Sequence, residues 1–126
     1  MDRRYLKACL IVVIAVVPLA GFAQTQMELN QQAGSALQEA DRQLNAAYSK
    51  LRNRLSPESR SKLQAAEEAW IRFRDQECAF IGSATAGGSV NSMIIADCRT
   101  GLTNRRIKDI EVQLNCQEGD LSCVRN

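Results

Sequence analysis

The chain has 126 residues, a length suited to one domain, and its 16 basic side chains nearly balance 14 acidic ones, with no histidine. The small positive excess belongs to residues 1–23, because residues 24–126 carry 13 basic and 13 acidic side chains. A neutral chain has no electrostatic basis for binding nucleic acid or an anionic membrane, so neither is expected as a partner.

Residues 1–23 have the pattern of a secretory signal peptide. Basic residues precede an uncharged apolar run at 8–17, and small residues stand at the positions before an expected cleavage after Ala23. The apolar run is too short to span a membrane, and an uncleaved N-terminal anchor is the alternative. We therefore expect a mature domain of residues 24–126 that is periplasmic or secreted and has no membrane attachment.

The first helix is predicted to begin at Thr25. Glu28 follows three residues later, which is the spacing of a capping box. Apolar residues then recur every three or four positions, as expected for one face of a helix. They are Leu37, Ala40, Leu44, Ala47, Leu51 and Leu55.

A second helix is predicted to start directly after this stripe. Ser56 suits the N-cap and Pro57 suits the first helical position. Gly82 is expected to end the helix. The side chains that we expect to face the core are Leu63, Ala66, Trp70, Phe73, Phe80 and Ile81.

Residues 83–92 contain no charge and are rich in glycine and serine, which predicts a flexible loop. A third helix follows, with Ile95, Cys98, Leu102, Ile107, Ile110 and Leu114 on its apolar positions. The tail from Cys116 onward reads as irregular. Short connections between helices favour antiparallel neighbours, so the expected fold is all-α, an up-down-up bundle of three helices.

Four cysteines remain after Cys9 leaves with the signal peptide. An even number in an oxidising compartment implies two disulfides, with three possible pairings. We favour Cys78–Cys98, which the antiparallel register places within about a turn of each other, and Cys116–Cys123, which closes a short turn-rich loop. The alternative is a zinc site, which the absence of histidine and of a C-x-x-C motif disfavours.

The same register predicts charged pairs inside the bundle. Folding the first two helices together brings Asp41 close to Trp70 and Arg74, which suggests an Asp41–Arg74 pair covered by the tryptophan. Folding the second and third helices brings Arg106 opposite Glu67 and its neighbour Glu68. The alternative role for the arginines is anion binding. For Trp70 the helical spacing favours a core position, and the alternative is stacking on a ligand.

Five short motifs occur in order over residues 26–114: Ala40-Asp41-x-x-Leu44-Asn45-x-x-Tyr48, Leu55-Ser56-Pro57-Glu58, Ala69-Trp70-x-x-x-Arg74-Asp75-x-x-Cys78, Gly87-Gly88-Ser89 with Cys98, and Leu102-Thr103-x-x-Arg106. By these motifs the chain resembles the lysozyme inhibitor LprI-like N-terminal domain family of small secreted bacterial proteins. The resemblance implies a helical, disulfide-bonded, extracytoplasmic domain, and for a few members lysozyme inhibition. One departure is Glu67, where the family often has glutamine.

No catalytic constellation is evident, so we expect a protein that is not an enzyme and that uses no metal and no cofactor. Without histidine, the usual general base and the Ser/His and Cys/His arrangements are excluded. Asp75 and Glu77 stand two residues apart on a helix and cannot face each other as a glycosidase pair.

The surface most suited to a partner is the 83–92 loop. Its small polar residues offer hydrogen bonds to the catalytic carboxylates of a lysozyme or another peptidoglycan hydrolase. The residues concerned are Gly87, Gly88, Ser89, Asn91 and Ser92. The alternative is that the loop only connects two helices.

Two function classes stay open. The first is a binding protein that inhibits a lysozyme-type hydrolase. The second is a structural or stress-related envelope protein without a hydrolase partner, including one that associates with itself. An exposed apolar stripe on the third helix would favour the second class, because Ile94, Ile95, Ile107 and Ile110 cannot all face one core direction. The oligomeric state is left open by the sequence.

Overall fold

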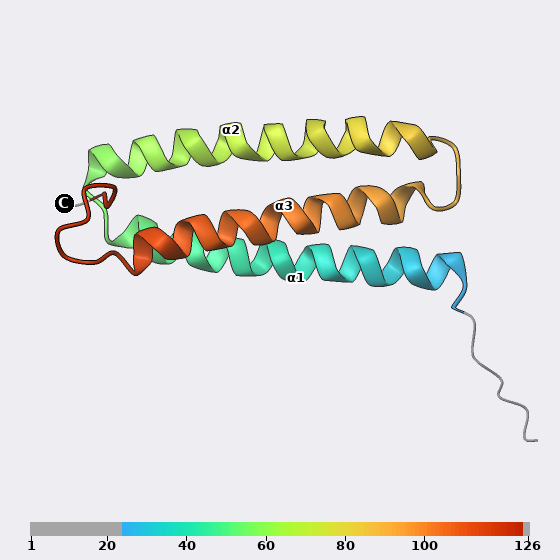
Figure 1. Ribbon diagram of the computed structural model, residues 1–126, viewed down its shortest axis with the longest axis horizontal. Coiled ribbons are helices and arrows are strands. Elements are labelled where there is room, and N and C mark those ends of the chain that lie inside the picture. Colours follow the sequence, from blue (N-terminus) through green and yellow to red (C-terminus); the bar gives the residue numbers. More distant parts are fainter. Residues whose placement is uncertain (1–23, 125–126) are drawn as a thin grey trace, which may run out of the picture.

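The structure, a computed structural model, describes residues 24–124. It contains three helices, α1 (Gln26–Asn53), α2 (Pro57–Gly82) and α3 (Asn91–Leu114), and one short 3-10 helix, η1 (Ser83–Thr85). Successive helices run in opposite directions, and α3 lies between α1 and α2 in the view of Figure 1. The expected all-α, up-down-up bundle is confirmed. The expected signal peptide lies outside the described residues.

The starts of the first two helices are where the sequence places them. The Thr25 hydroxyl accepts from the backbone amide of Glu28 at 3.2 Å, and the Glu28 carboxylate accepts from the amide of Thr25 at 2.8 Å, which completes the capping box. Ser56 caps α2, whose first residue is Pro57. Each cap satisfies backbone amides that a helix leaves without internal partners.

The connection between α2 and α3 is shorter and more ordered than the expected loop 83–92. Its first three residues form η1, and α3 already begins at Asn91. The start of α3 was missed because its N-cap is Val90, which has no side-chain acceptor and so leaves no capping signal in the sequence. Asn91 and Ser92 are therefore helical residues and not part of a loop.

The core lies mainly between α1 and α3. Small side chains on α1, at Ala33, Ala40 and Ala47, are buried and allow α3 to approach closely. Toward the C-terminal end of α1, the larger side chains of Leu44 and Leu51 pack in one cluster with Ile110 of α3. In contrast, α1 and α2 share few backbone contacts, and α2 packs mainly on α3. The space between α1 and α2 is bridged by long side chains of α2.

The expected inward face of α2 was wrong at four positions. Ala66, Phe73, Phe80 and Ile81 are exposed, Phe73 by 52% and Phe80 by 75%. The face that turns inward is rotated from the predicted one and includes two charged residues. It consists of Leu63, Glu67, Trp70, Arg74, Cys78 and Gly82. Burial of Glu67 and Arg74 is possible because each meets an opposite charge on another helix.

Both favoured disulfides are confirmed, so the zinc alternative is wrong. Cys78 of α2 bonds Cys98 of α3, with 5.6 Å between their Cα atoms, and Cys78 is completely buried. Cys116 bonds Cys123 in the segment after α3. The first bond joins the two helices that flank the loop. The antiparallel packing of α3 on α2 makes these two residues, twenty positions apart, neighbours.

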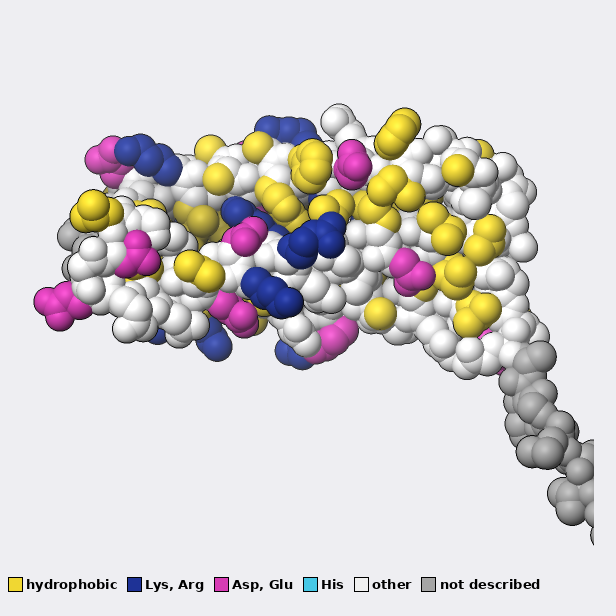
Figure 2. All heavy atoms as spheres, in the orientation of Figure 1, with side chains coloured by type: hydrophobic (Ala, Val, Ile, Leu, Met, Phe, Trp, Pro, Cys, Tyr) yellow, Lys and Arg dark blue, Asp and Glu magenta, His cyan; other side chains and the backbone are white. Residues whose placement is uncertain are grey.

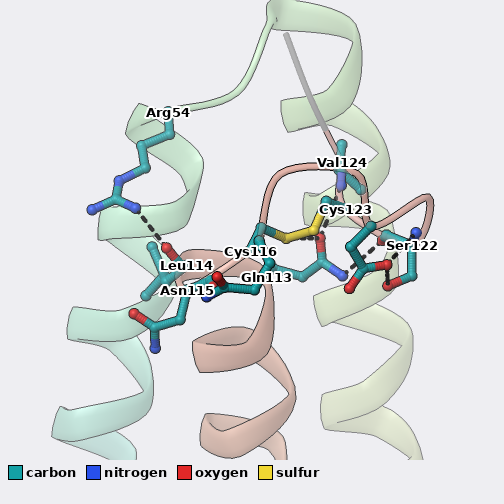
Figure 3. Close-up of a disulfide and its surroundings, with 10 residues drawn as sticks. Arg54, Gln113, Leu114, Asn115, Cys116, Ser122, Cys123 and Val124 are labelled. Atoms are coloured by element: carbon teal, nitrogen blue, oxygen red, sulfur yellow. Dashed lines mark hydrogen bonds between the residues drawn. A yellow bond between two sulfur atoms is a disulfide. The ribbon is translucent and has the colours of Figure 1, made fainter.

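The second disulfide organises the C-terminal tail (residues 115–124) against the end of α3 (Figure 3). The amide nitrogen of Gln113 donates to the carbonyl of Ser122 at 3.0 Å, and its amide oxygen accepts from the backbone of Val124 at 3.0 Å. Arg54, just after α1, donates to the carbonyl of Leu114. The tail lacks regular structure, as expected, but it is held at both ends.

Candidate functional site

Two regions could serve a function, and the first is a charged cluster around Trp70. Arg74 is its centre and is only 9% exposed. One of its terminal nitrogens lies 2.7 Å from Asp41 of α1 and donates to the fully buried hydroxyl of Thr103 of α3 at 3.0 Å. Its Nε donates to Asp75 at 3.1 Å. Arg74 therefore connects all three helices through charge-assisted hydrogen bonds.

Trp70 lies close to two cations rather than deep in the core. The guanidinium carbons of Arg74 and Arg106 lie 5.4 and 5.8 Å from the centre of its ring. Both distances are within the range of cation–π attraction. Trp70 is half-buried and also contacts the apolar core. The indole therefore adds cation–π attraction to the charged cluster.

Arg106 has its own carboxylate partner. Its side chain lies 2.9 Å from Glu67, and both groups are largely buried, at 18% and 11% exposure. Glu67 is the position where the family often has glutamine, and here its charge is neutralised inside the bundle. It faces α3 and not a surface that a partner could reach. This departure therefore has no direct bearing on a binding surface.

The cluster extends to the surface through Asp75. The same carboxylate oxygen that accepts from Arg74 lies 3.2 Å from Nε of Arg99, outside hydrogen-bonding geometry. Each arginine of the cluster thus already faces a carboxylate, which leaves no uncompensated positive charge to attract an anion. The arrangement suits a polar connector of three helices better than a ligand site.

The cluster offers no arrangement for catalysis. Asp75 is engaged by two arginines, and Glu77 stands on another side of the same helix. Among residues 24–124, no group of three or more potential metal ligands comes together. In the same range, no helix is long and apolar enough to cross a membrane.

The second region is the uncharged end, defined as residues 29–38 of α1 and residues 79–96 around the α2–α3 connection. Neither segment contains a charged residue. They meet at one end of the bundle, where the side-chain amide of Asn30 donates to the carbonyl of Ser89 at 2.9 Å. Figure 2 shows hydrophobic side chains gathered over this end, while most charged side chains lie over the rest of the visible face.

The turn at the uncharged end is held from several sides. The amide of Asn91 donates to the carbonyl of Gly82 at 2.6 Å and to the hydroxyl of Thr85 at 3.0 Å. The backbone of Gly82 lies so close to Ile95 that a Cβ atom there would stand 2.5 Å from the isoleucine side chain. Together with the nearby Cys78–Cys98 bond, these contacts fix the direction of the turn.

The tip of this turn is exposed. Gly87, Gly88 and Ser89 are exposed, as is Ser92 in the first turn of α3, whereas Asn91 is half-buried and its amide donates within the turn. Gly87 has φ +80°, a conformation that side-chain-bearing residues rarely adopt. Within residues 24–124, no intramolecular hydrogen bond engages the Ser89 hydroxyl. Of the five residues expected to contact a partner, four are therefore available and Asn91 is not.

Sequence reasoning missed the contribution of α1 to this region. It singled out the connection alone, although residues 29–38 are equally free of charge. Their lack of charge was visible in the sequence, but their position beside the turn depends on the antiparallel packing of α1 on α3. The feature that could have been noticed is a pair of uncharged segments that the up-down-up topology brings to one end.

These features define a small three-helix domain with a buried charged connector, two disulfides and one uncharged end. The chain belongs to the family described as lysozyme inhibitor LprI, whose model matches residues 20–110. A relative from Rhizobium meliloti (strain 1021), described as uncharacterized protein R02472, is 27% identical over 109 residues, covering 76% of this chain and 78% of the relative. No solved structure matches.

Proposed function

We propose that this protein is a secreted or periplasmic inhibitor of a lysozyme-type peptidoglycan hydrolase, and that it binds the enzyme through the uncharged end. Its family is one of lysozyme inhibitors, which supports the activity. The observation that carries the choice of surface is the exposed turn around Gly87–Ser89, which lies in an uncharged segment beside the uncharged residues 29–38 of α1. The buried charged cluster is a structural connector in this proposal.

The absence of charge is useful for entering a hydrolase cleft. Glycoside hydrolases place two carboxyl groups beside the scissile bond, so an acidic residue in the inserted turn would be repelled. A basic residue would be stripped of water on burial and would need an exact partner. Small polar groups such as the Ser89 hydroxyl can instead donate hydrogen bonds to the carboxylates without bringing a charge of their own.

Rigidity of the turn supports the same proposal. A mobile loop loses conformational entropy when it binds, whereas a turn already fixed by its own hydrogen bonds loses little. Asn91, Thr85 and the Asn30–Ser89 contact supply this order before any partner arrives. The turn lies at one end of the bundle beside the start of α1 (Figure 1), so a cleft that receives the turn also meets the first residues of α1.

The test is a cell-wall lysis assay with the oxidised protein and a panel of lysozymes. Ala86→Glu combined with Ser89→Glu places two carboxylates on the exposed tip and should abolish inhibition. A matched control, Asn45→Asp with Ala46→Glu on the exposed side of α1, changes the net charge equally and should retain inhibition.

Three results would count against the proposal. Absence of inhibition by the unmodified protein removes the activity for the enzymes tested. Inhibition that survives the turn variant moves the site elsewhere. Loss of inhibition in both variants points to the overall charge and not to the turn. Circular dichroism of each variant separates these results from loss of folding.

A further inference from the structure

The helix α2 carries a second apolar surface that the inhibitor proposal does not use. We name it the α2 stripe; it consists of Ala66, Ala69, Phe73, Gln76 and Phe80, all of which are exposed. Phe73 is 52% exposed and Phe80 is 75% exposed. Phenylalanine side chains with so much exposed surface are unusual on a helix unless something covers them.

The spacing of the α2 stripe is that of a helix-pairing seam. Its residues follow one another at intervals of three, four, three and four, and Phe73 and Phe80 are seven apart. This heptad pattern keeps apolar side chains on one line that faces a partner helix. The inward residues Glu67 and Arg74 lie on another side of α2, so the stripe is separate from the helix's own packing.

The α2 stripe is complementary to itself. Phe73 lies midway between Ala66 and Phe80, seven residues from each. If two copies of α2 pair antiparallel about Phe73, the large Phe80 of each copy lies opposite the small Ala66 of the other. At both ends of the contact the large Phe80 side chain then fits into the space left by the small Ala66 side chain. The two Phe73 rings meet at the two-fold axis.

We infer that the α2 stripe is the contact between two copies of this chain, which form an antiparallel dimer. The pattern of large and small residues favours a second copy over an unrelated partner because it satisfies two-fold symmetry without any further assumption. The stripe itself carries no charge to be buried. Antiparallel pairing places the two Gly87–Ser89 turns at opposite ends, so each stays free to bind.

A contact made by one helix from each copy is small, so the dimer should be weak and dependent on concentration. Sedimentation velocity from about 1 µM to about 1 mM should show the weight-average mass rising toward twice that of the monomer. Phe73→Glu should leave a monomer at every concentration. Val112→Glu, which changes a 60% exposed apolar residue of α3 in the same way, should still dimerise.

The register can be tested by cross-linking at exposed positions outside the α2 stripe. In the proposed arrangement Lys62 of one copy lies opposite Ala84 of the other, because each is eleven residues from Phe73. A mixture of Lys62→Cys and Ala84→Cys proteins should form a mixed cross-link with a short bifunctional maleimide. Either variant alone should not, since identical positions would be separated by about 33 Å along the helix.

Several outcomes would overturn the inference. A monomer throughout the concentration range, or a dimer that persists in Phe73→Glu, excludes the α2 stripe as the contact. Cross-linking of Lys62→Cys with itself indicates a parallel arrangement and rejects the proposed register. If the unmodified protein is already monomeric and folded Phe73→Glu loses hydrolase inhibition, the stripe belongs to the inhibitory surface instead of a dimer contact.

Discussion

Replacement of Arg74 tests whether the charged cluster holds the bundle together. Arg74→Met keeps an unbranched side chain of similar length and removes the guanidinium from Asp41, Asp75 and Thr103. Loss of one partner from a buried ion pair typically costs about 3–5 kcal/mol. Here Asp41 and Asp75 are 41% and 42% exposed and keep part of their hydration, so we expect a smaller loss, of about 2–3 kcal/mol.

The assay is urea denaturation followed by far-ultraviolet circular dichroism, with the free energy of unfolding extrapolated to water. For a domain of about 100 residues, the expected loss corresponds to a decrease of roughly 8–20 °C in the thermal midpoint. Arg72→Met is the matched control, because Arg72 is exposed on the same helix, and it should change the stability by less than about 0.5 kcal/mol.

A double-mutant cycle with Asp41→Asn separates the ion pair from the remaining contacts of Arg74. The 2.7 Å contact predicts a coupling energy of about 1 kcal/mol or more between the two positions. If Arg74→Met destabilises no more than Arg72→Met, the cluster does not stabilise the fold. The arginines would then be free for the anion-binding role that the sequence left open.

Three further predictions concern the disulfides, a glycine and a surface carboxylate. Replacing Cys78 and Cys98 by alanine should cost about 3 kcal/mol, and replacing Cys116 and Cys123 about 2 kcal/mol because the closed loop is shorter; urea titration compares the two. Gly82→Val should lower the thermal midpoint, since its Cβ would clash with Ile95, whereas Gly34→Ala, with open space around it, should not. The hydrogen bond from Arg42 lowers the pKa of the Glu39 carboxyl from 4.5 to about 2, so this contact stabilises the fold above pH 4.5 and is lost as the pH falls toward 2. A titration by nuclear magnetic resonance should give this pKa, and Arg42→Gln should raise it; a midpoint near 4.5 in the unmodified protein would contradict the contact.

The sequence by itself determined the elements and their order. Capping residues marked the starts of α1 and α2, and apolar spacing indicated three helices, because local hydrogen bonds and periodicity depend on neighbours along the chain. The even cysteine count, the antiparallel register and the short loop between Cys116 and Cys123 favoured the two disulfides that the structure contains. Motif order was enough to indicate the family.

The tertiary structure alone decided which side of α2 faces inward. The register suggested an Asp41–Arg74 pair, but Phe73 was also expected inside. Phe73 is exposed because the inward side of α2 is turned toward Arg74, which reaches both Asp41 and Thr103 on the other helices. Likewise, the uncharged end exists only because packing brings α1 beside the α2–α3 turn. Burial of a charge depends on contacts between residues distant in sequence, and only the folded bundle supplies them.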